Sequence, residues 1–400
     1  MTDGKSNVTG DPLLTQNVKG QWDNPYILPW WQQLVFILAF VVMFIVAVVG
    51  NFVVIWIVLA HKRMRTVTNY FLVNLAIADG LISLFNTLFN TVYLLYGNWP
   101  FGRNYCKFSM FISPCTISAS VFTFVAIALD RYMAIIHPLK PRWPARVVIG
   151  IIGAIWFTSI GISLPNLMFA ETHSYRYDSG RIRTICVLNW PDGVYKTMDF
   201  VYNVVLLVLN YFLPMIILAI AYVIVGVHLW HSRSIGEKTP RQIESVKSKR
   251  KVVKMLIIVV VIFGICWLPM HVYFVLTNFC ENIGIYPHIQ QIYLVIFWMA
   301  MSNSMYNPII YCWMNTRFRK GFKYVFRCCP FVTWGPKDSL LHIGGTTVRQ
   351  SWGGTECKLE RNGSTMHTLD ESLDETTCYN YSHSRYPREG RYNGMAENSM

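Results

Sequence analysis

Long apolar blocks alternate with short polar segments along this chain. Lipid offers no hydrogen bonds, so a segment that crosses it must pair its own backbone groups, which a helix does. About twenty apolar residues cross the hydrocarbon as a helix. The pattern therefore predicts an all-α membrane protein, a bundle of seven transmembrane helices. The predicted spans are 31–60, 68–96, 104–137, 146–169, 197–229, 252–278 and 286–312.

The segments around the spans differ in composition. We expect an extracellular N-terminal segment over 1–30, the seven-transmembrane domain over 31–312 and a cytoplasmic tail over 328–400. Between them, 313–327 interleaves aromatic residues with Arg and Lys at helical spacing, which predicts a short amphipathic eighth helix on the inner leaflet. The tail is polar and rich in Gly, Ser, Thr and Asn, so we predict that it is disordered.

Basic residues gather on one side of the predicted bundle. The chain is 53% hydrophobic and only 14% charged, whereas a soluble domain carries about a quarter charged residues. Much of its +14 net charge comes from 61–66, 138–146, 230–254 and the segment after the last span. Basic clusters that alternate with spans follow the positive-inside rule and argue against nucleic acid as a partner. They predict a multi-pass plasma-membrane protein with its N-terminus outside and its C-terminus inside.

An ionisable residue, Asp79, lies within the second predicted span. Such a residue is costly in lipid and is a functional candidate by default. Ser120, Asn303, Ser304 and Asn307 can supply oxygens and amides from other spans. Oxygen ligands suit a small hard cation, so we hypothesise an allosteric sodium site with no other cofactor. A structural carboxyl bonded within the bundle is the alternative.

Three motifs combine movable side chains with the ends or kinks of spans. We predict that Arg131, at the end of the third span, pairs with Asp130 at rest and is released towards a partner. Proline kinks a helix, and Pro269 and Pro308 each neighbour a bulky or polar side chain. The alternatives are a snorkelling arginine and plain core filling. The predicted switch residues are Asp130, Arg131, Tyr132, Tyr222, Trp267, Pro269, Asn307, Pro308 and Tyr311.

Cysteine and asparagine positions predict three modifications. Cys106 and Cys186 flank the outer side of the predicted bundle, where oxidising conditions favour a disulfide. Cys328 and Cys329 follow the amphipathic segment and are palmitoylation candidates. Asn7 begins an Asn-Val-Thr glycosylation sequon on the outer side.

These motifs together resemble the rhodopsin-like (class A) G protein-coupled receptors over roughly 30–331, and within that class the tachykinin (neurokinin) receptors. The resemblance implies a receptor for an amidated tachykinin-type neuropeptide that signals through Gq, phospholipase C and calcium. A class A receptor for another peptide is the alternative. It also implies arrestin and receptor kinases as partners of the tail, and no enzymatic activity. The segments that carry it are HKRMRTVTNYFLVNLA (61–76), DRYMAIIHPLKPR (130–142), KRKVVKM (249–255), ICWLPMH (265–271), IQQIYL (289–294), MYNPIIYC (305–312) and FRCCPF (326–331).

The resemblance also implies a peptide pocket. Asn166 stands where the family often has Gln, and Asn203 and Ser109 where it often has His, so ligand selectivity is expected to differ. Asp199 keeps an acidic residue at the pocket rim and is expected to meet a basic ligand residue. The predicted ligand-binding residues are Asn86, Asn90, Asn166, Asp199, His271 and Tyr293.

Four other classes of protein fit less well. An opsin needs a lysine in the seventh span, and 286–312 contains none. An amine receptor would have an outer carboxylate in the third span, where Ser113, Pro114 and Cys115 stand. A transporter built on inverted repeats would show internal similarity, which we do not detect. No nucleophile–base or metal-ligand spacing points to an enzyme.

Overall fold

We describe the protein from a computed structural model. It falls into two units, Met1–Trp334 and Gly335–Met400, each described by itself. The glycosylation site predicted at Asn7 lies outside the described residues. The structure describes residues 27–177, 180–193, 197–231, 240–279, 288–330, 332, 349–352, 355–358 and 377–379.

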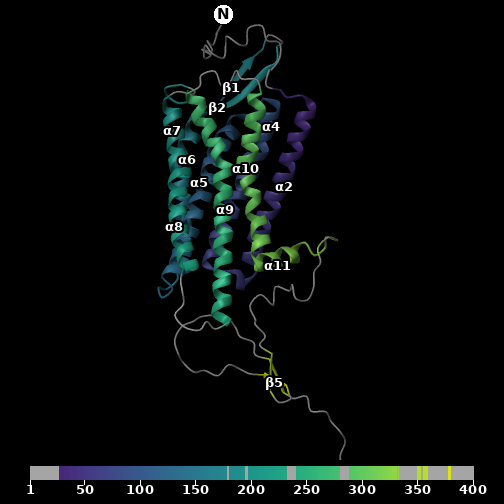
Figure 1. The fold of residues 1–400 in the computed structure, drawn as a ribbon. Helices are drawn as coiled ribbons and strands as arrows, with labels where there is room; N and C mark the ends of the chain where they lie inside the picture. Colours follow the sequence, from purple (N-terminus) through teal and green to yellow (C-terminus); the bar gives the residue numbers. More distant parts are fainter. Residues whose placement is uncertain are drawn as a thin grey trace, which may run out of the picture. The chain divides into compact units, whose positions relative to one another are not determined.

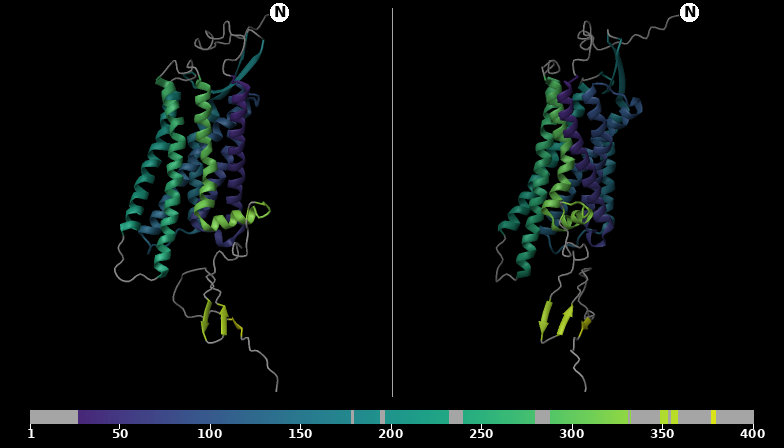
Figure 2. Two further views of the ribbon diagram at one scale, coloured as in Figure 1. Left: turned by 45° about the vertical axis from the view of Figure 1, so that its right-hand side comes forward. Right: turned by 90° about the vertical axis from the view of Figure 1, so that its right-hand side faces the viewer.

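Seven long helical stretches run side by side in the first unit (Figures 1 and 2). Two of them are interrupted by a wide π-helical turn, η2 in the second and η3 in the fifth. The stretches are α2 (Trp30–Ala60); α3 (Val67–Ile82), η2 (Ser83–Thr87) and α4 (Leu88–Tyr96); α5 (Gly102–Ile136); α6 (Ala145–Phe169); α7 (Thr197–Leu207), η3 (Val208–Phe212) and α8 (Leu213–His231); α9 (Pro240–Phe279); and α10 (Ile289–Met314).

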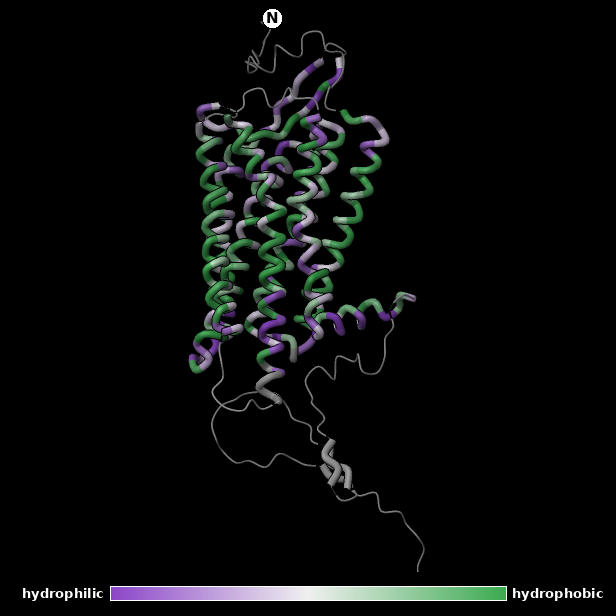
Figure 3. The backbone as a smooth tube through the Cα atoms, in the orientation of Figure 1, coloured by the Kyte–Doolittle hydropathy of each residue, from purple (hydrophilic) through white to green (hydrophobic). Residues whose placement is uncertain are grey.

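Six of these stretches are long and apolar enough to cross a membrane, and Figure 3 shows their apolar middle. The seventh, α10, has 26 residues, which is also a spanning length. It is less apolar because it carries four polar side chains that are buried. Together the seven stretches confirm the predicted seven-transmembrane fold of a multi-pass membrane protein. The four side chains are Ser302, Asn303, Ser304 and Asn307.

Buried amides join the helices. Helices in lipid associate through close packing and interhelical hydrogen bonds. Asn51 on α2 donates to the backbone oxygen of Ser304 on α10 at 2.9 Å. Asn74 on α3 donates to Thr123 on α5 at 2.8 Å and accepts from the indole of Trp156 on α6, also at 2.8 Å. Asn51 therefore joins two helices, and Asn74 joins three others.

Two glycines allow close approach to the side chains of Pro308 and Ile57. A Cβ atom on Gly50 would lie 2.7 Å from Cγ of Pro308, so α2 and α10 can touch only with glycine here. A Cβ atom on Gly321 would lie 2.6 Å from Cδ1 of Ile57. Close backbone approach favours glycine at both positions.

A β-hairpin covers one end of the bundle, called here the hairpin end (Figure 1). The apolar pattern predicts only helices, and the structure adds β1 (Ala170–Arg176) paired antiparallel with β2 (Ile182–Leu188). Gly180 in the turn has φ +78°, which glycine adopts without strain. Arg183 donates to the carbonyl of Gly97 at 2.7 Å and so fastens the hairpin to the segment between α4 and α5.

A short helix, α11 (Thr316–Val325), turns away from α10 at the opposite end, called here the α11 end (Figures 1 and 2). It lies within the predicted eighth helix. Phe318 is fully buried and packs on the ring of Tyr311, with centroids 5.8 Å apart. Tyr324 stacks on Trp56 at 6.1 Å. The aromatic face thus docks α11 on the bundle, and Arg319 adds a hydrogen bond to the backbone oxygen of Cys312 on α10 at 3.2 Å.

The sixth stretch begins earlier than its apolar pattern predicts. The charge pattern predicts a loop over 230–254, and the structure contradicts this from residue 240 onward, because α9 already begins at Pro240. Proline is favourable in the first turn of a helix. The following residues are mostly Arg, Gln, Glu and Lys, which are good helix formers. The apolar pattern marks only where the helix enters lipid, so it misses this polar extension.

The second unit contains three short strands. They are β3 (Arg349–Trp352), β4 (Thr355–Lys358) and β5 (Thr377–Tyr379), which pair antiparallel in this order. The polar composition predicts disorder here and gives no sign of them. The remainder of this unit lies outside the described residues.

Candidate functional site

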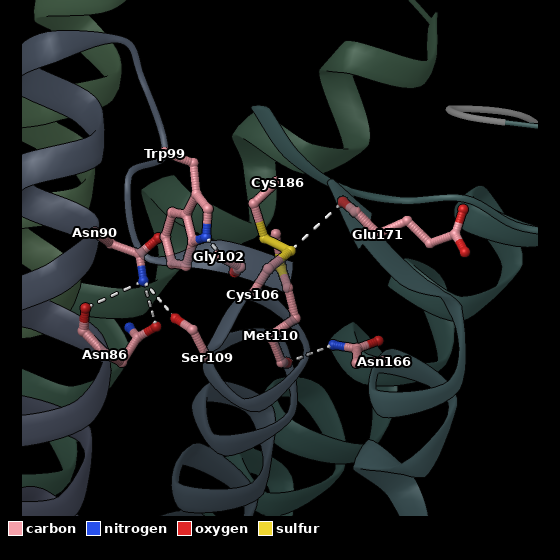
Figure 4. Close-up of a disulfide and its surroundings, with 10 residues drawn as sticks. All are labelled: Asn86, Asn90, Trp99, Gly102, Cys106, Ser109, Met110, Asn166, Glu171 and Cys186. Atoms are coloured by element: carbon pink, nitrogen blue, oxygen red, sulfur yellow. Dashed lines mark hydrogen bonds between the residues drawn. A yellow bond between two sulfur atoms is a disulfide. The ribbon is translucent and has the colours of Figure 1, made fainter. Parts of the chain in front are cut away.

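Three polar side chains meet between the second and third stretches near the hairpin end (Figure 4). The amide of Asn90 donates to the side-chain oxygen of Asn86 at 2.7 Å and to Oγ of Ser109 at 3.0 Å. The amide of Asn86 lies 3.7 Å from Sδ of Met301 on α10. Asn86 sits in the π-helical turn, which shifts the helix face by one residue. The structure thus brings two predicted ligand-binding residues and Ser109 into one cluster.

A chain of aromatic rings runs inward from the hairpin end to the kink in α9. The ring of His271 lies 5.3 Å from that of Tyr211 and 6.3 Å from that of Trp267. Trp267 continues to Phe263 at 6.2 Å, and Phe263 to Phe124 on α5 at 5.6 Å. Within the described part of the chain, Nε2 of His271 and Nε1 of Trp267 are buried without a hydrogen-bond partner. These two groups therefore retain unused hydrogen-bonding capacity.

Asn166 and Tyr293 occupy different helices of the same end. The ring of Tyr293 lies 5.0 Å from that of Tyr273 and 6.3 Å from that of Phe297. The amide of Asn166 donates to the backbone oxygen of Met110 at 3.0 Å (Figure 4). Its side-chain oxygen is buried and finds no partner among the described residues. The side-chain oxygen of Asn166 can therefore still accept a hydrogen bond.

Asp199 forms a separate cluster with Trp190 and Asn203. Both carboxylate oxygens accept hydrogen bonds, at 3.0 Å from the indole of Trp190 and at 3.1 Å from the amide of Asn203. Asp199 is only 8% exposed. In this structure it therefore holds Trp190 against α7.

A disulfide, drawn in Figure 4, and an ion pair hold the hairpin over the bundle. The predicted disulfide between Cys106 and Cys186 is present, with Cα atoms 5.7 Å apart. Glu171 on β1 accepts from Asn189 at 3.2 Å and pairs with Arg103 on α5 at 2.9 Å. The hydrogen bond from Asn189, with the charge of Arg103, holds the pKa of the Glu171 carboxyl below its usual range. Glu171 therefore stays ionised at neutral pH.

A groove between α9 and α10 is a different feature. Val272, Leu276 and Ile292 in its wall are exposed. Since its wall is apolar and contains none of the predicted ligand-binding residues, it is not the predicted peptide pocket. Its lining consists of Pro269, Val272, Tyr273, Leu276, Ile289, Ile292 and Ile296.

Deep in the bundle, Asp79 is only 2% exposed and accepts two hydrogen bonds. The amide of Asn307 donates at 2.6 Å, and Oγ of Ser120 lies at 3.4 Å. Asn303 on α10 has a buried side-chain oxygen without a partner in the described residues. Ser304 contributes its backbone oxygen to Asn51. A carboxylate, a hydroxyl and an orphaned amide oxygen make a donor set that fits a small hard cation.

At the α11 end, Asp130 and Arg131 form the predicted ion pair at 2.6 Å. Thr68 on α3 donates to the same carboxylate oxygen at 2.7 Å and also accepts from Arg131. Tyr222 and Tyr311 are buried in this bundle, and the hydroxyl of Tyr311 has no partner in the described residues. The two tyrosines are therefore enclosed while Arg131 is paired.

Several contacting residues were not in the predicted set. Thr68, Tyr211 and Trp190 are common residue types in or beside a span, so the sequence carries no signal for them. Asn51 differs, because an amide within an apolar block marks a polar contact in lipid. The sequence therefore carries a signal for Asn51.

Two exposed free thiols, Cys328 and Cys329, follow α11 directly. Accessible cysteines beside a membrane-surface helix suit acylation. Their palmitoylation remains a prediction.

Comparison with known proteins places the chain in a family. The family described as 7 transmembrane receptor (rhodopsin family) matches residues 50–311. The Tachykinin-like peptides receptor 99D of Drosophila melanogaster is 50% identical over 332 residues, which cover 82% of this chain and 64% of that receptor. The Neuromedin-K receptor of Oryctolagus cuniculus is 48% identical over 317 residues, covering 79% of this chain and 66% of that receptor.

A third relative is matched over more of its own length. The Substance-P receptor of Meriones unguiculatus is 43% identical over 362 residues, which cover 90% of this chain and 87% of that receptor. The chain spans a little under two thirds of the length of the first two relatives. Members of this family are receptors and not enzymes. The chain therefore belongs to the rhodopsin family of seven-transmembrane receptors.

Proposed function

We propose that this protein is a G protein-coupled receptor of the plasma membrane for an amidated tachykinin-type neuropeptide. The observation that carries the proposal is its 50% identity over 332 residues to a tachykinin-like peptides receptor. The hairpin end faces the outside, and the α11 end faces the cytoplasm. The signal passes through Gq and phospholipase C to calcium. A class A receptor for another peptide is the second candidate.

The peptide enters at the hairpin end. Buried polar groups without a partner cost about 1–3 kcal/mol each. His271, Trp267 and Asn166 each carry one such group, so a ligand rich in amide groups gains by pairing them. Asn86 and Asn90 add amides that can exchange their mutual hydrogen bonds for bonds to the peptide. An amidated peptide terminus supplies both the donors and the acceptors that this pocket lacks, with Tyr293 as a further wall.

Binding shifts a population between two states, by as much as the peptide's differential affinity for them. Repacking of Trp267 at the kinks of Pro269 and Pro308 moves the cytoplasmic end of α9 outward. Arg131, Tyr222 and Tyr311 then become open to the G protein. Tyr132, whose ring lies 5.8 Å from that of His137, is part of the same surface.

A sodium ion at Asp79 favours the resting state. Asp79, Ser120, Asn303 and Ser304 would hold it, and its charge would oppose inward collapse of α10. The tail binds receptor kinases and arrestin, and acylation of Cys328 and Cys329 anchors α11 in lipid.

Calcium imaging of transfected cells against a panel of amidated peptides tests the ligand class. We expect calcium responses to nanomolar or micromolar concentrations of tachykinin-type peptides, and no response to amidated peptides of unrelated sequence. Silence to every tachykinin-type peptide, with receptor present at the surface, would exclude this ligand class. Antibody access to tags at the two termini in intact cells tests the orientation.

Replacing Asp130 with asparagine is expected to raise signalling without ligand. The substitution removes the ion pair with Arg131 and weakens the hydrogen bond from Thr68. Both contacts are partly buried. Lys249 stands where some members of the class place a carboxylate, and among the described residues Asp130 is the acid that pairs with Arg131. A charge-assisted hydrogen bond contributes about 1.5–3 kcal/mol, so we expect roughly a tenfold rise in basal GTPγS exchange.

The matched control is Glu244→Gln, which removes an exposed acid on α9. It should leave the basal rate unchanged. A basal rate for Asp130→Asn equal to that of the control, at equal surface amount, would show that Asp130 does not restrain Arg131.

A further inference from the structure

A cationic clasp joins α8 and α9 at the α11 end. The guanidinium of Arg250 on α9 donates to the backbone oxygen of Leu229 on α8 through Nε at 3.0 Å and through Nη2 at 2.6 Å. The same guanidinium lies over the ring of Trp230, 5.6 Å from its centroid, and the ammonium of Lys254 lies 5.9 Å from it. Two cationic side chains of α9 thus contact one aromatic ring of α8, and Arg250 also binds a backbone carbonyl of α8.

Arg250 holds a carbonyl in the last described turn of α8, which the structure gives as Leu213–His231. Carbonyls in the last turn of a helix can accept bonds from side chains. They also carry the negative end of the helix dipole, which favours a cation. A planar guanidinium can meet a carbonyl with two donors and stack on an indole at once, which an ammonium cannot. The position therefore suits arginine in particular.

The clasp lies where a tilt of α9 acts most strongly. Arg250 stands 19 residues before Pro269 in one continuous helix, which is a lever of roughly 28 Å. A tilt of about 10° at the proline would then move Arg250 by about 5 Å. N–H···O hydrogen bonds have donor–acceptor distances of about 2.7–3.2 Å, so a displacement of this size breaks the clasp unless α8 follows.

The connection between the two helices is long enough to allow other spacings. Eight residues, 232–239, connect them, and a segment of that length can span about 26 Å when extended. Closer to the middle of the bundle, Tyr211 donates to the carbonyl of Gly264 at 3.1 Å. That contact is only five residues from Pro269, so a tilt disturbs it far less. Arg250 therefore sets the spacing at the far end.

We propose that Arg250, with Trp230 and the carbonyl of Leu229, is a positioning device that holds α9 against α8 and favours the resting receptor. It acts separately from the pair between Asp130 and Arg131, which lies on α5. The inference rests on the proposed G protein coupling for its signalling consequence. The geometric consequence, a fixed spacing between α8 and α9, does not.

Two measurements on the full-length receptor test the clasp. The first is basal GTPγS exchange in membranes at equal surface amount. We expect a rise of roughly fivefold to tenfold for Arg250→Gln. Arg250→Lys and Trp230→Leu each keep part of the clasp and should give smaller rises. The matched control is Lys251→Gln, which removes an exposed neighbouring charge and should equal the unmodified receptor.

The second measurement is the distance between spin labels at Val227 on α8 and Val246 on α9, two exposed positions. In purified receptor without ligand, Arg250→Gln should broaden the distribution of this distance and increase its mean. Lys251→Gln should change neither. An unchanged distance in Arg250→Gln overturns the clasp. A changed distance with a basal rate no higher than the control overturns its role as a restraint. Absence of exchange in every form counts against the coupling, and the distance then decides the clasp.

Discussion

Removing the disulfide between Cys106 and Cys186 is expected to abolish peptide binding at the cell surface. The bond closes a loop with a sequence separation of 80 residues. Restraining a loop of this length contributes about 4–5 kcal/mol in the chain-entropy account. Cys186 is also the point on β2 that fixes the hairpin to α5. Without the bond, the hairpin loses its anchor above the cluster of Asn86, Asn90 and Ser109.

The double variant Cys106→Ser and Cys186→Ser avoids an unpaired thiol, and radioligand binding with surface staining provides the measurement. We expect specific binding to fall at least a hundredfold, and thermal stability in detergent to fall as well. Cys115→Ala is the matched control, because Cys115 is a buried free thiol on the same helix. Wild-type binding by the double variant would show that Arg183 and Glu171 hold the hairpin adequately alone.

Replacing Asp79 with asparagine is expected to remove the effect of sodium on agonist affinity without impairing folding. In Asp79→Ala the amide of Asn307 loses its buried acceptor, which costs about 1–3 kcal/mol. In Asp79→Asn an oxygen remains to accept from Asn307, but the negative charge is lost. We therefore expect Asp79→Asn to fold normally and to lose the sodium effect on agonist affinity. A typical coupling corresponds to about a fivefold or larger shift.

Agonist affinity in sodium and in choline buffers gives the measurement. The unmodified receptor should bind agonist more weakly in sodium, and Asp79→Asn should bind equally in both. Ser163→Ala is a suitable control, because its hydroxyl is buried and bonded only within α6. A sodium effect that persists in Asp79→Asn would place the ion elsewhere.

The helix boundaries were predictable where lipid sets them. The first span is expected at 31–60 and observed at Trp30–Ala60, and the fourth is expected at 146–169 and observed at Ala145–Phe169. Bilayer thickness fixes such lengths. Where a helix continues into water, as α9 does from Pro240, apolar content ends before the helix does.

The polar contacts were predictable only in part. Acidic residues are rare in lipid, so an acid there indicates that polar partners lie nearby. Asp79 accepts hydrogen bonds from both Ser120 and Asn307. Thr68 and Tyr211 carry no such signal, because their side chains are frequent in spans. The engagement of Asp199 by Trp190 depends on how a loop folds back, which spacing along the chain does not encode.

The polar character of α10 bears on how the protein is made. Four buried polar side chains weaken its partitioning into lipid when it leaves the insertion machinery, since polar groups at mid-membrane are costly. Two of its polar contacts, to Asn51 and Asp79, are made with helices synthesised much earlier. Membrane integration of the last helix therefore depends on a bundle already formed by the earlier helices. Errors in the early helices would then appear as failed insertion of the final one during biogenesis.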